Sequence, residues 1–168
     1  MYPKIKFKID TQRDVLCAIN FIKRNKSNKI FLKWFLPKEI QYILTGNLSK
    51  REKGKIIKAY ALDVHKTNKD EIKRGVRKAV KDWQGVERRF FKLVDKVFQN
   101  HKWPKGNYVG FATVFNMYPR NINEKTFFFP YVHNIPKYAN HVISHEMLHF
   151  IFFDYIDKFY NLKENSEF

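Results

Sequence analysis

Three residues near the C-terminus, His145, Glu146 and His149, form an H-E-x-x-H motif inside a strongly apolar stretch. On a helix, residues four apart share one face, so both imidazoles can point at a single cation. Catalytic zinc sites use such a pair with one further protein ligand and a water molecule. Bound zinc lowers the pKa of this water, and a neighbouring carboxylate can accept its proton. The motif therefore predicts a zinc hydrolase, most often a peptidase, with Glu146 as the general base.

The segment around the motif, residues 139–160, favours a helix because it contains neither Gly nor Pro. Its apolar side chains surround the helix axis on nearly every side, which is typical of a buried helix. Two histidines and a glutamate would be costly to bury there without partners, and a metal ion would satisfy all three. The alternative is a buried helix whose histidines hydrogen-bond to neighbouring backbone.

The motif resembles that of the zincin metallopeptidases, and the resemblance covers roughly residues 105–160. It implies an α+β fold in which a small, mostly antiparallel sheet precedes the motif helix and an edge strand binds an extended peptide. Residues 108–115 and 126–132 are the matching β-rich segments. Pro130 cannot donate to a β-ladder, so the second segment is expected to be an edge strand or to end there.

The third zinc ligand is not fixed by the motif. No histidine follows His149, so the longer metzincin pattern is absent. Asp154 lies about 180° around the helix from His145, at 100° per residue, and points away. SprT-like zincins carry their third ligand, a histidine, near the position of Glu164, and gluzincins use a glutamate slightly further on. We expect zinc on His145, His149 and Glu164; the alternatives are Glu167, a residue beyond Phe168, or a solvated tail without a ligand.

Other side chains could stabilise the oxyanion formed during hydrolysis. The candidates are His133, His141, Tyr155 and Tyr160, although histidines of this kind more often lie at the surface and such tyrosines more often belong to the core. The isolated His65 and His101 suggest no role.

The net charge of +17, from 33 basic and 16 acidic residues, is high enough to suggest contact with nucleic acid or another acidic surface. The lysines are spread along the chain, which favours an ordinary solvated surface. The best candidates for non-specific, salt-sensitive phosphate contacts lie along one expected helix: Arg74, Arg77, Lys78, Lys81, Arg88, Arg89 and Lys92. The alternative function is therefore a basic nucleic-acid-associated module with a structural or inactive zinc site. Both functions can coexist, because SprT-like proteases act next to DNA.

The sequence shows neither a secretory leader nor an uncharged apolar run of membrane-spanning length. We expect a cytoplasmic protein that acts on a peptide or protein. Its single cysteine, Cys17, excludes an intramolecular disulfide and a Cys-based zinc site, and is expected to be buried on a helix.

The elements that must position the motif form one expected domain, residues 1–168, of α+β class. Residues 1–101 are predicted to be mainly helical after a half-exposed strand that ends at Ile9. Helices are expected from residue 11, after Pro37, after the capping box of Ser49 and Glu52, and over residues 69–100. Gly75 and Gly85 weaken the last of these or allow close packing. Residues 105–168 supply a hairpin-like strand pair and then the metal-binding helix.

Overall fold

The strands of the protein form one mixed sheet in the order β1-β2-β4-β3. The computed structural model describes residues 2–161, and its class over this range is α+β, as predicted. Strand β1 pairs parallel to β2, β2 pairs parallel to β4, and the short β3 pairs antiparallel to β4. The strand bounds are Ile5–Ile9 (β1), Tyr108–Thr113 (β2), Arg120–Asn121 (β3) and Thr126–Pro130 (β4).

The prediction of a mostly antiparallel sheet with a hairpin-like strand pair is wrong, because two of the three pairings are parallel. A strand pattern indicates which residues are extended, but strand direction depends on the path of the connection. Here the chain runs from β2 to β3, which lies on the far side of β4, and then turns back into β4, which runs parallel to β2.

Strand β4 is also not the edge that Pro130 suggested. Thr126 and Phe127 pair with β2 on one side and with β3 on the other. Pro130 is instead the last residue of β4, which was the alternative interpretation. The outer edge beside β4 therefore belongs to β3.

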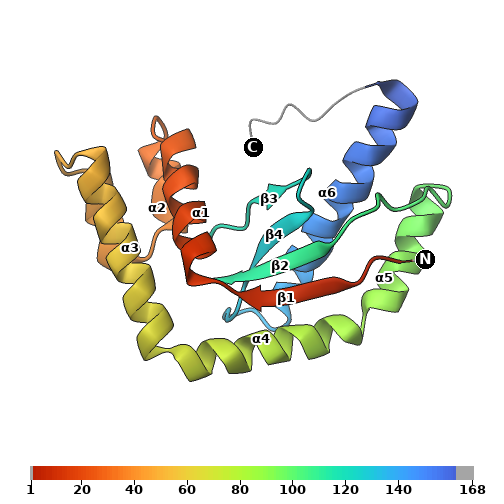
Figure 1. Ribbon diagram of the computed structural model, residues 1–168, viewed down its shortest axis with the longest axis horizontal. Helices are drawn as coiled ribbons and strands as arrows, with labels where there is room; N and C mark the ends of the chain where they lie inside the picture. The colour runs from red at the N-terminus through yellow and green to blue at the C-terminus, as the bar shows by residue number, and fades with distance from the viewer. Residues whose placement is uncertain (1, 162–168) are drawn as a thin grey trace.

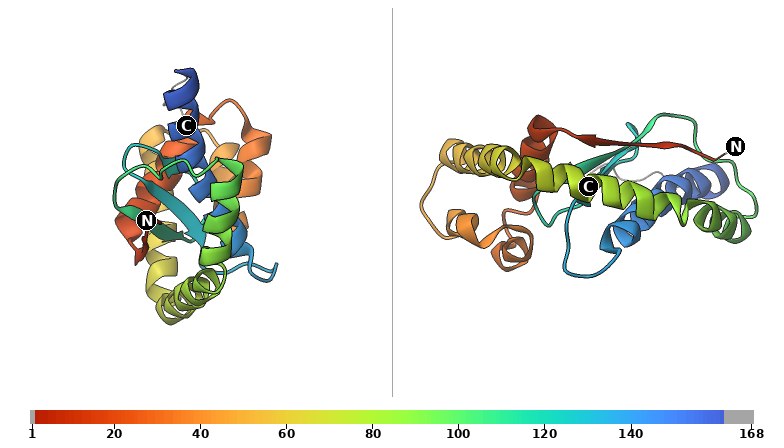
Figure 2. Two further views of the ribbon diagram at one scale, coloured as in Figure 1. Left: turned by 90° about the vertical axis from the view of Figure 1, so that its right-hand side faces the viewer. Right: turned by 90° about the horizontal axis from the view of Figure 1, so that it is seen from below.

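Seven helices surround this sheet within residues 2–161 (Figure 1). In Figure 1, α1 to α3 lie at one end of the sheet, α4 runs beneath it, α5 lies at the other end, and α6 runs from behind the strands toward that end. The view from below in Figure 2 shows α3, α4 and α5 following one another along the length of the molecule, with α4 in the middle. The helix bounds are Thr11–Arg24 (α1), Lys29–Phe35 (α2), Lys38–Leu44 (the 3₁₀ helix η1), Lys50–Thr67 (α3), Lys69–Gln84 (α4), Glu87–Val97 (α5) and Tyr138–Tyr160 (α6).

The single helix expected over residues 69–100 is two helices in the structure. Helix α4 ends with Gly85 as its C-cap, and α5 begins two residues later. Glycine lowers helix stability, and the break lets α5 turn and bury Phe91 and Val94. At Gly75 the expectation of close packing is confirmed: a Cβ there would lie 2.1 Å from the carbonyl oxygen of Tyr131.

Two apolar cores hold these elements together. The first lies among α1, α2, η1 and α3 and includes Leu32, Ile43 and Ile57. The second lies between the sheet and helices α4, α5 and α6 and includes Trp83 and Phe150. The capping box of Ser49 and Glu52 is confirmed at the start of α3, and Cys17 is buried on α1 as predicted.

A buried polar cluster around Asp14 joins α1, α3 and β2. Asp14 is fully buried, and its Oδ2 lies 2.9 Å from Nε2 of His65 and accepts a 3.0 Å hydrogen bond from the backbone N–H of Val114. Its Oδ1 accepts a 2.6 Å hydrogen bond from the hydroxyl of Thr113. His65, which the sequence left without a role, is thus part of the link between the first core and the sheet. Among residues 2–161, no helix is long and apolar enough to cross a membrane.

Candidate metal centre

Helix α6 carries the motif and is buried along only part of its length. Ile143, Met147 and Phe150 are fully buried in the second core. The C-terminal part of the helix extends past the sheet (Figure 1), and Phe152 and Phe159 are 43% and 59% exposed. The prediction of burial around the whole helix is therefore wrong for its C-terminal half.

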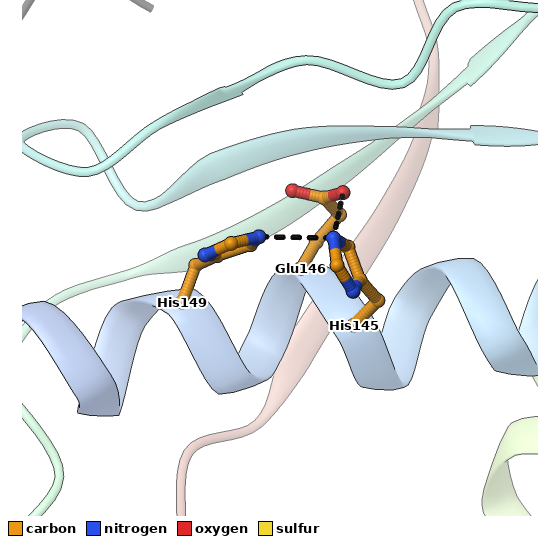
Figure 3. Close-up of side chains that lie close together, drawn as sticks. All are labelled: His145, Glu146 and His149. Atoms are coloured by element: carbon orange, nitrogen blue, oxygen red, sulfur yellow. Dashed lines mark hydrogen bonds and ion pairs between the residues drawn. The ribbon is translucent and has the colours of Figure 1, made fainter.

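The two imidazoles of the motif converge. Nε2 of His145 lies 3.0 Å from Nε2 of His149, with the rings perpendicular, and Figure 3 shows both turned to the side of the helix that faces the sheet. Two nitrogen ligands of a tetrahedral zinc ion, each about 2.0–2.1 Å from the metal, lie about 3.3 Å apart. The observed separation therefore fits a shared zinc ion.

Glu146 stands beside this pair. Its Oε1 lies 3.9 Å from Nε2 of His145, and the candidate ligand atoms of His145, Glu146 and His149 all lie within 4.8 Å of one another. The carboxylate is thus further away than the spacing of two ligands on one zinc ion. This position suits a group that contacts a metal-bound water better than a third ligand.

Burial controls the electrostatics of the site. It raises the pKa of Glu146 from 4.5 to about 7, while the nearby Arg120 guanidinium acts in the opposite direction. Burial, followed by the positive charge of Arg120 and by His145, lowers the pKa of His149 to about 4. The His149 imidazole is therefore neutral at pH 7, as metal ligation requires.

Arg120 is the residue of the site that sequence reasoning missed. Its Nη1 lies 3.6 Å from Oε2 of Glu146, and its guanidinium lies over the ring of Phe153 at 5.7 Å. Phe153 in turn stacks on His149, with ring centroids 5.8 Å apart. The sequence carries no signal for this role, because only the pairing of β3 with β4 brings Arg120 beside α6.

The predicted third ligand, Glu164, and its alternative Glu167 lie outside the described residues. Within residues 2–161, the group of side chains that could hold a metal ion consists of His145, Glu146 and His149. The third protein ligand therefore remains a prediction.

The remaining candidates have other surroundings. Asp154 points away from the motif, as expected, with its Oδ2 2.8 Å from Nε2 of His101. Tyr155 packs against His101, and Tyr160 is 64% exposed. His133 stacks on Tyr138 and accepts a hydrogen bond from the backbone N–H of Ile135. His141 is exposed and lies on the same cleft as the motif.

That cleft has a volume of about 1240 Å³ and extends from the motif to α1 and α2. His145 and Glu146 line one side of it, and residues 118–124, which include β3, line another. β3 is the outer strand of the sheet, so the sheet borders the cleft at this strand.

Comparison of the chain with protein-family models, curated proteins and solved structures gave no match. The resemblance to zincins accordingly rests on the sequence motif alone.

Proposed function

We propose that the protein is a zinc-dependent metallopeptidase in which His145, His149 and the downstream carboxylate of Glu164 hold the metal. The 3.0 Å approach of the two Nε2 atoms is the observation that carries this proposal. Two imidazoles that meet at this distance from adjacent turns form the half-site that catalytic zinc requires.

A bound zinc ion would supply a Lewis acid and an activated water for attack on the peptide carbonyl. Glu146 would accept a proton from this water and pass it to the leaving amine. In the metal-free protein, burial raises the pKa of Glu146 to about 7, and a group that accepts and then donates a proton works best when its pKa lies near the ambient pH. Arg120, 3.6 Å from the second carboxylate oxygen, orients Glu146.

The substrate backbone is proposed to add to the outer edge of β3. This replaces the segment of residues 126–132 as the peptide-binding strand, because β4 is covered by β3 at Thr126 and Phe127. An extended peptide on a free strand edge gains main-chain hydrogen bonds. Residues 118–124 line the cleft that also contains Glu146, so a peptide on this edge lies next to the proposed general base.

The test combines zinc content with cleavage of an unstructured polypeptide. Glu146→Gln is expected to retain zinc and to lose turnover, because the amide cannot accept a proton. Replacing both His145 and His149 with alanine is expected to remove the zinc. Asp157→Asn, which changes an exposed carboxylate on the same helix, is the control and should keep both properties.

Two results would contradict the proposal. Wild-type turnover in Glu146→Gln would exclude Glu146 as the base, and unchanged zinc in the double alanine variant would exclude the metal site. Loss of zinc in Glu146→Gln would make Glu146 a ligand and favour a structural metal site.

A nucleic-acid-associated module is the second candidate function. Four of the predicted phosphate-binding residues, Arg74, Arg77, Lys78 and Lys81, are exposed on α4, and each lies three or four residues from two of the others. They therefore share one face of that helix. The remaining three lie on the separate helix α5, so the basic stripe is shorter than the sequence suggested.

A further inference from the structure

The cleft at the metal centre continues to a wall formed by α1 and α2. One face of α1 lines it, with residues three or four apart: Arg13, Leu16, Cys17, Asn20, Phe21 and Arg24. Phe31 and Phe35 of α2 extend this wall. In Figure 1, β3 lies between α1 and α2 on the left and α6 on the right.

The wall presents apolar surface that the fold does not use. Leu16 is 58% exposed and Phe31 is 38% exposed, although both line a concave part of the protein. Phe31 is held by its neighbours: its ring centroid lies 4.5 Å from that of Phe35 and 6.1 Å from that of Phe21. Exposed apolar side chains fixed in a cleft are typical of a ligand-binding surface.

We propose that Leu16 and Phe31 form a subsite for a large apolar side chain of an extended polypeptide substrate. This inference rests on the proposed peptidase function and names the substrate class: unfolded segments that carry large apolar residues. Such a side chain would be recognised by burial against Leu16 and the Phe31 ring, away from the scissile bond at His145 and Glu146.

Three observations favour a polypeptide over a small ligand. The volume of the cleft, about 1240 Å³, exceeds the range of about 300–1,000 Å³ typical of small-molecule sites. Residues 118–124, which include the outer strand β3, run along the same cleft, as an extended chain laid beside that strand requires. The apolar wall and the proposed general base line one continuous space, so a single chain can occupy both.

The test measures binding separately from cleavage, in a protein with the Glu146→Gln change. The probe is an unstructured, fluorescein-labelled peptide with two leucines among polar residues, and its partner carries serines in place of the leucines. We expect the leucine peptide to bind more tightly by fluorescence anisotropy. Adding Leu16→Ser or Phe31→Ser should weaken its binding about tenfold, because the leucine side chain then has less apolar surface to bury against. The serine peptide should be unaffected.

Ile30→Ser is the matched control, since Ile30 precedes Phe31 on α2, is 77% exposed and does not line the cleft. It should leave both affinities unchanged. Equal binding of the two peptides, or the same weakening in Ile30→Ser as in Phe31→Ser, would overturn the subsite. Selective binding without any cleavage by the wild-type protein would instead overturn the peptidase function and leave the subsite standing.

Discussion

Glu146 places a carboxylate where the protein excludes most solvent, with 4% of the residue exposed. Burial favours its protonated form, and the ion pair with Arg120 offsets this only in part, so the pKa remains near 7. The charged form of Glu146 therefore lowers the free energy of unfolding of the protein. Such a cost is typical of residues retained for chemistry and not for folding.

The cost predicts how the stability of the metal-free protein depends on pH. The folded protein holds the Glu146 proton to a higher pH than the unfolded chain does, so stability should fall as the pH rises from 4.5 to about 7. Glu146→Gln, which cannot ionise, should avoid this loss and be more stable at pH 8 by about 3 kcal/mol. Urea denaturation of both proteins in EDTA, at pH 4.5 and at pH 8, measures the difference. An advantage of the variant that does not grow with pH would contradict the assignment.

At the scale of elements, the contact between α4 and the end of β4 depends on the absence of a side chain at Gly75. A methyl group there would lie 2.1 Å from the carbonyl oxygen of Tyr131, so α4 would have to move. Residues 130–139, which lead from β4 into α6, border the same surface of α4. The position of α6, and with it the candidate metal centre, is thus coupled to this contact.

Two glycine substitutions test the close packing at Gly75, one at that contact and one at an uncrowded position of α3. Gly75→Ala should destabilise the protein by about 1–3 kcal/mol, because it overpacks the contact. Gly54→Ala, in the interior of α3, should stabilise it by about 0.5–1 kcal/mol, because the nearest atom to the new Cβ is 3.9 Å away and alanine favours helices. Thermal or urea unfolding distinguishes the two. A gain in stability for Gly75→Ala would show that α4 does not approach Tyr131 so closely.

At the scale of the whole molecule, one cleft lies between the two cores. Helices α1 and α2, which pack in the first core, line one side of it, and α6, which packs in the second core, lines another. The net charge of +17 surrounds this framework, and it attracts polyanions at low ionic strength whatever the cleft binds. The nucleic-acid function requires, in addition, that the basic residues on one face of α4 strengthen this attraction.

The nucleic-acid function predicts that duplex DNA affinity falls steeply with salt. Changing Arg74, Arg77, Lys78 and Lys81 to glutamine should reduce the slope of log affinity against log salt by about 0.9 for each phosphate that the variant no longer neutralises. The control changes four exposed cations of α3 to glutamine and removes the same charge: Arg51, Lys55, Lys58 and Lys66. Fluorescence anisotropy in a salt series measures both. Equal slopes in the two variants would assign the affinity to the diffuse basic surface and not to α4.

The sequence alone determined the features that depend on local periodicity. A helix through the motif sets His145 and His149 one turn apart, and the Ser49 and Glu52 capping box begins α3 as expected. These features need only neighbours along the chain, and the helix repeat supplies the geometry.

Tertiary structure alone decided the strand directions, the outer position of β3 and the place of Arg120 beside Glu146. The same holds for Asp14, which meets His65 from 51 residues away, and for the position of Leu16 on the same cleft as the motif. Such arrangements depend on how elements pack across the two cores, because residues far apart in sequence share no local pattern. The chain therefore carries two of its proposed zinc ligands and its proposed base within five consecutive residues, while the surroundings that tune them come from the fold.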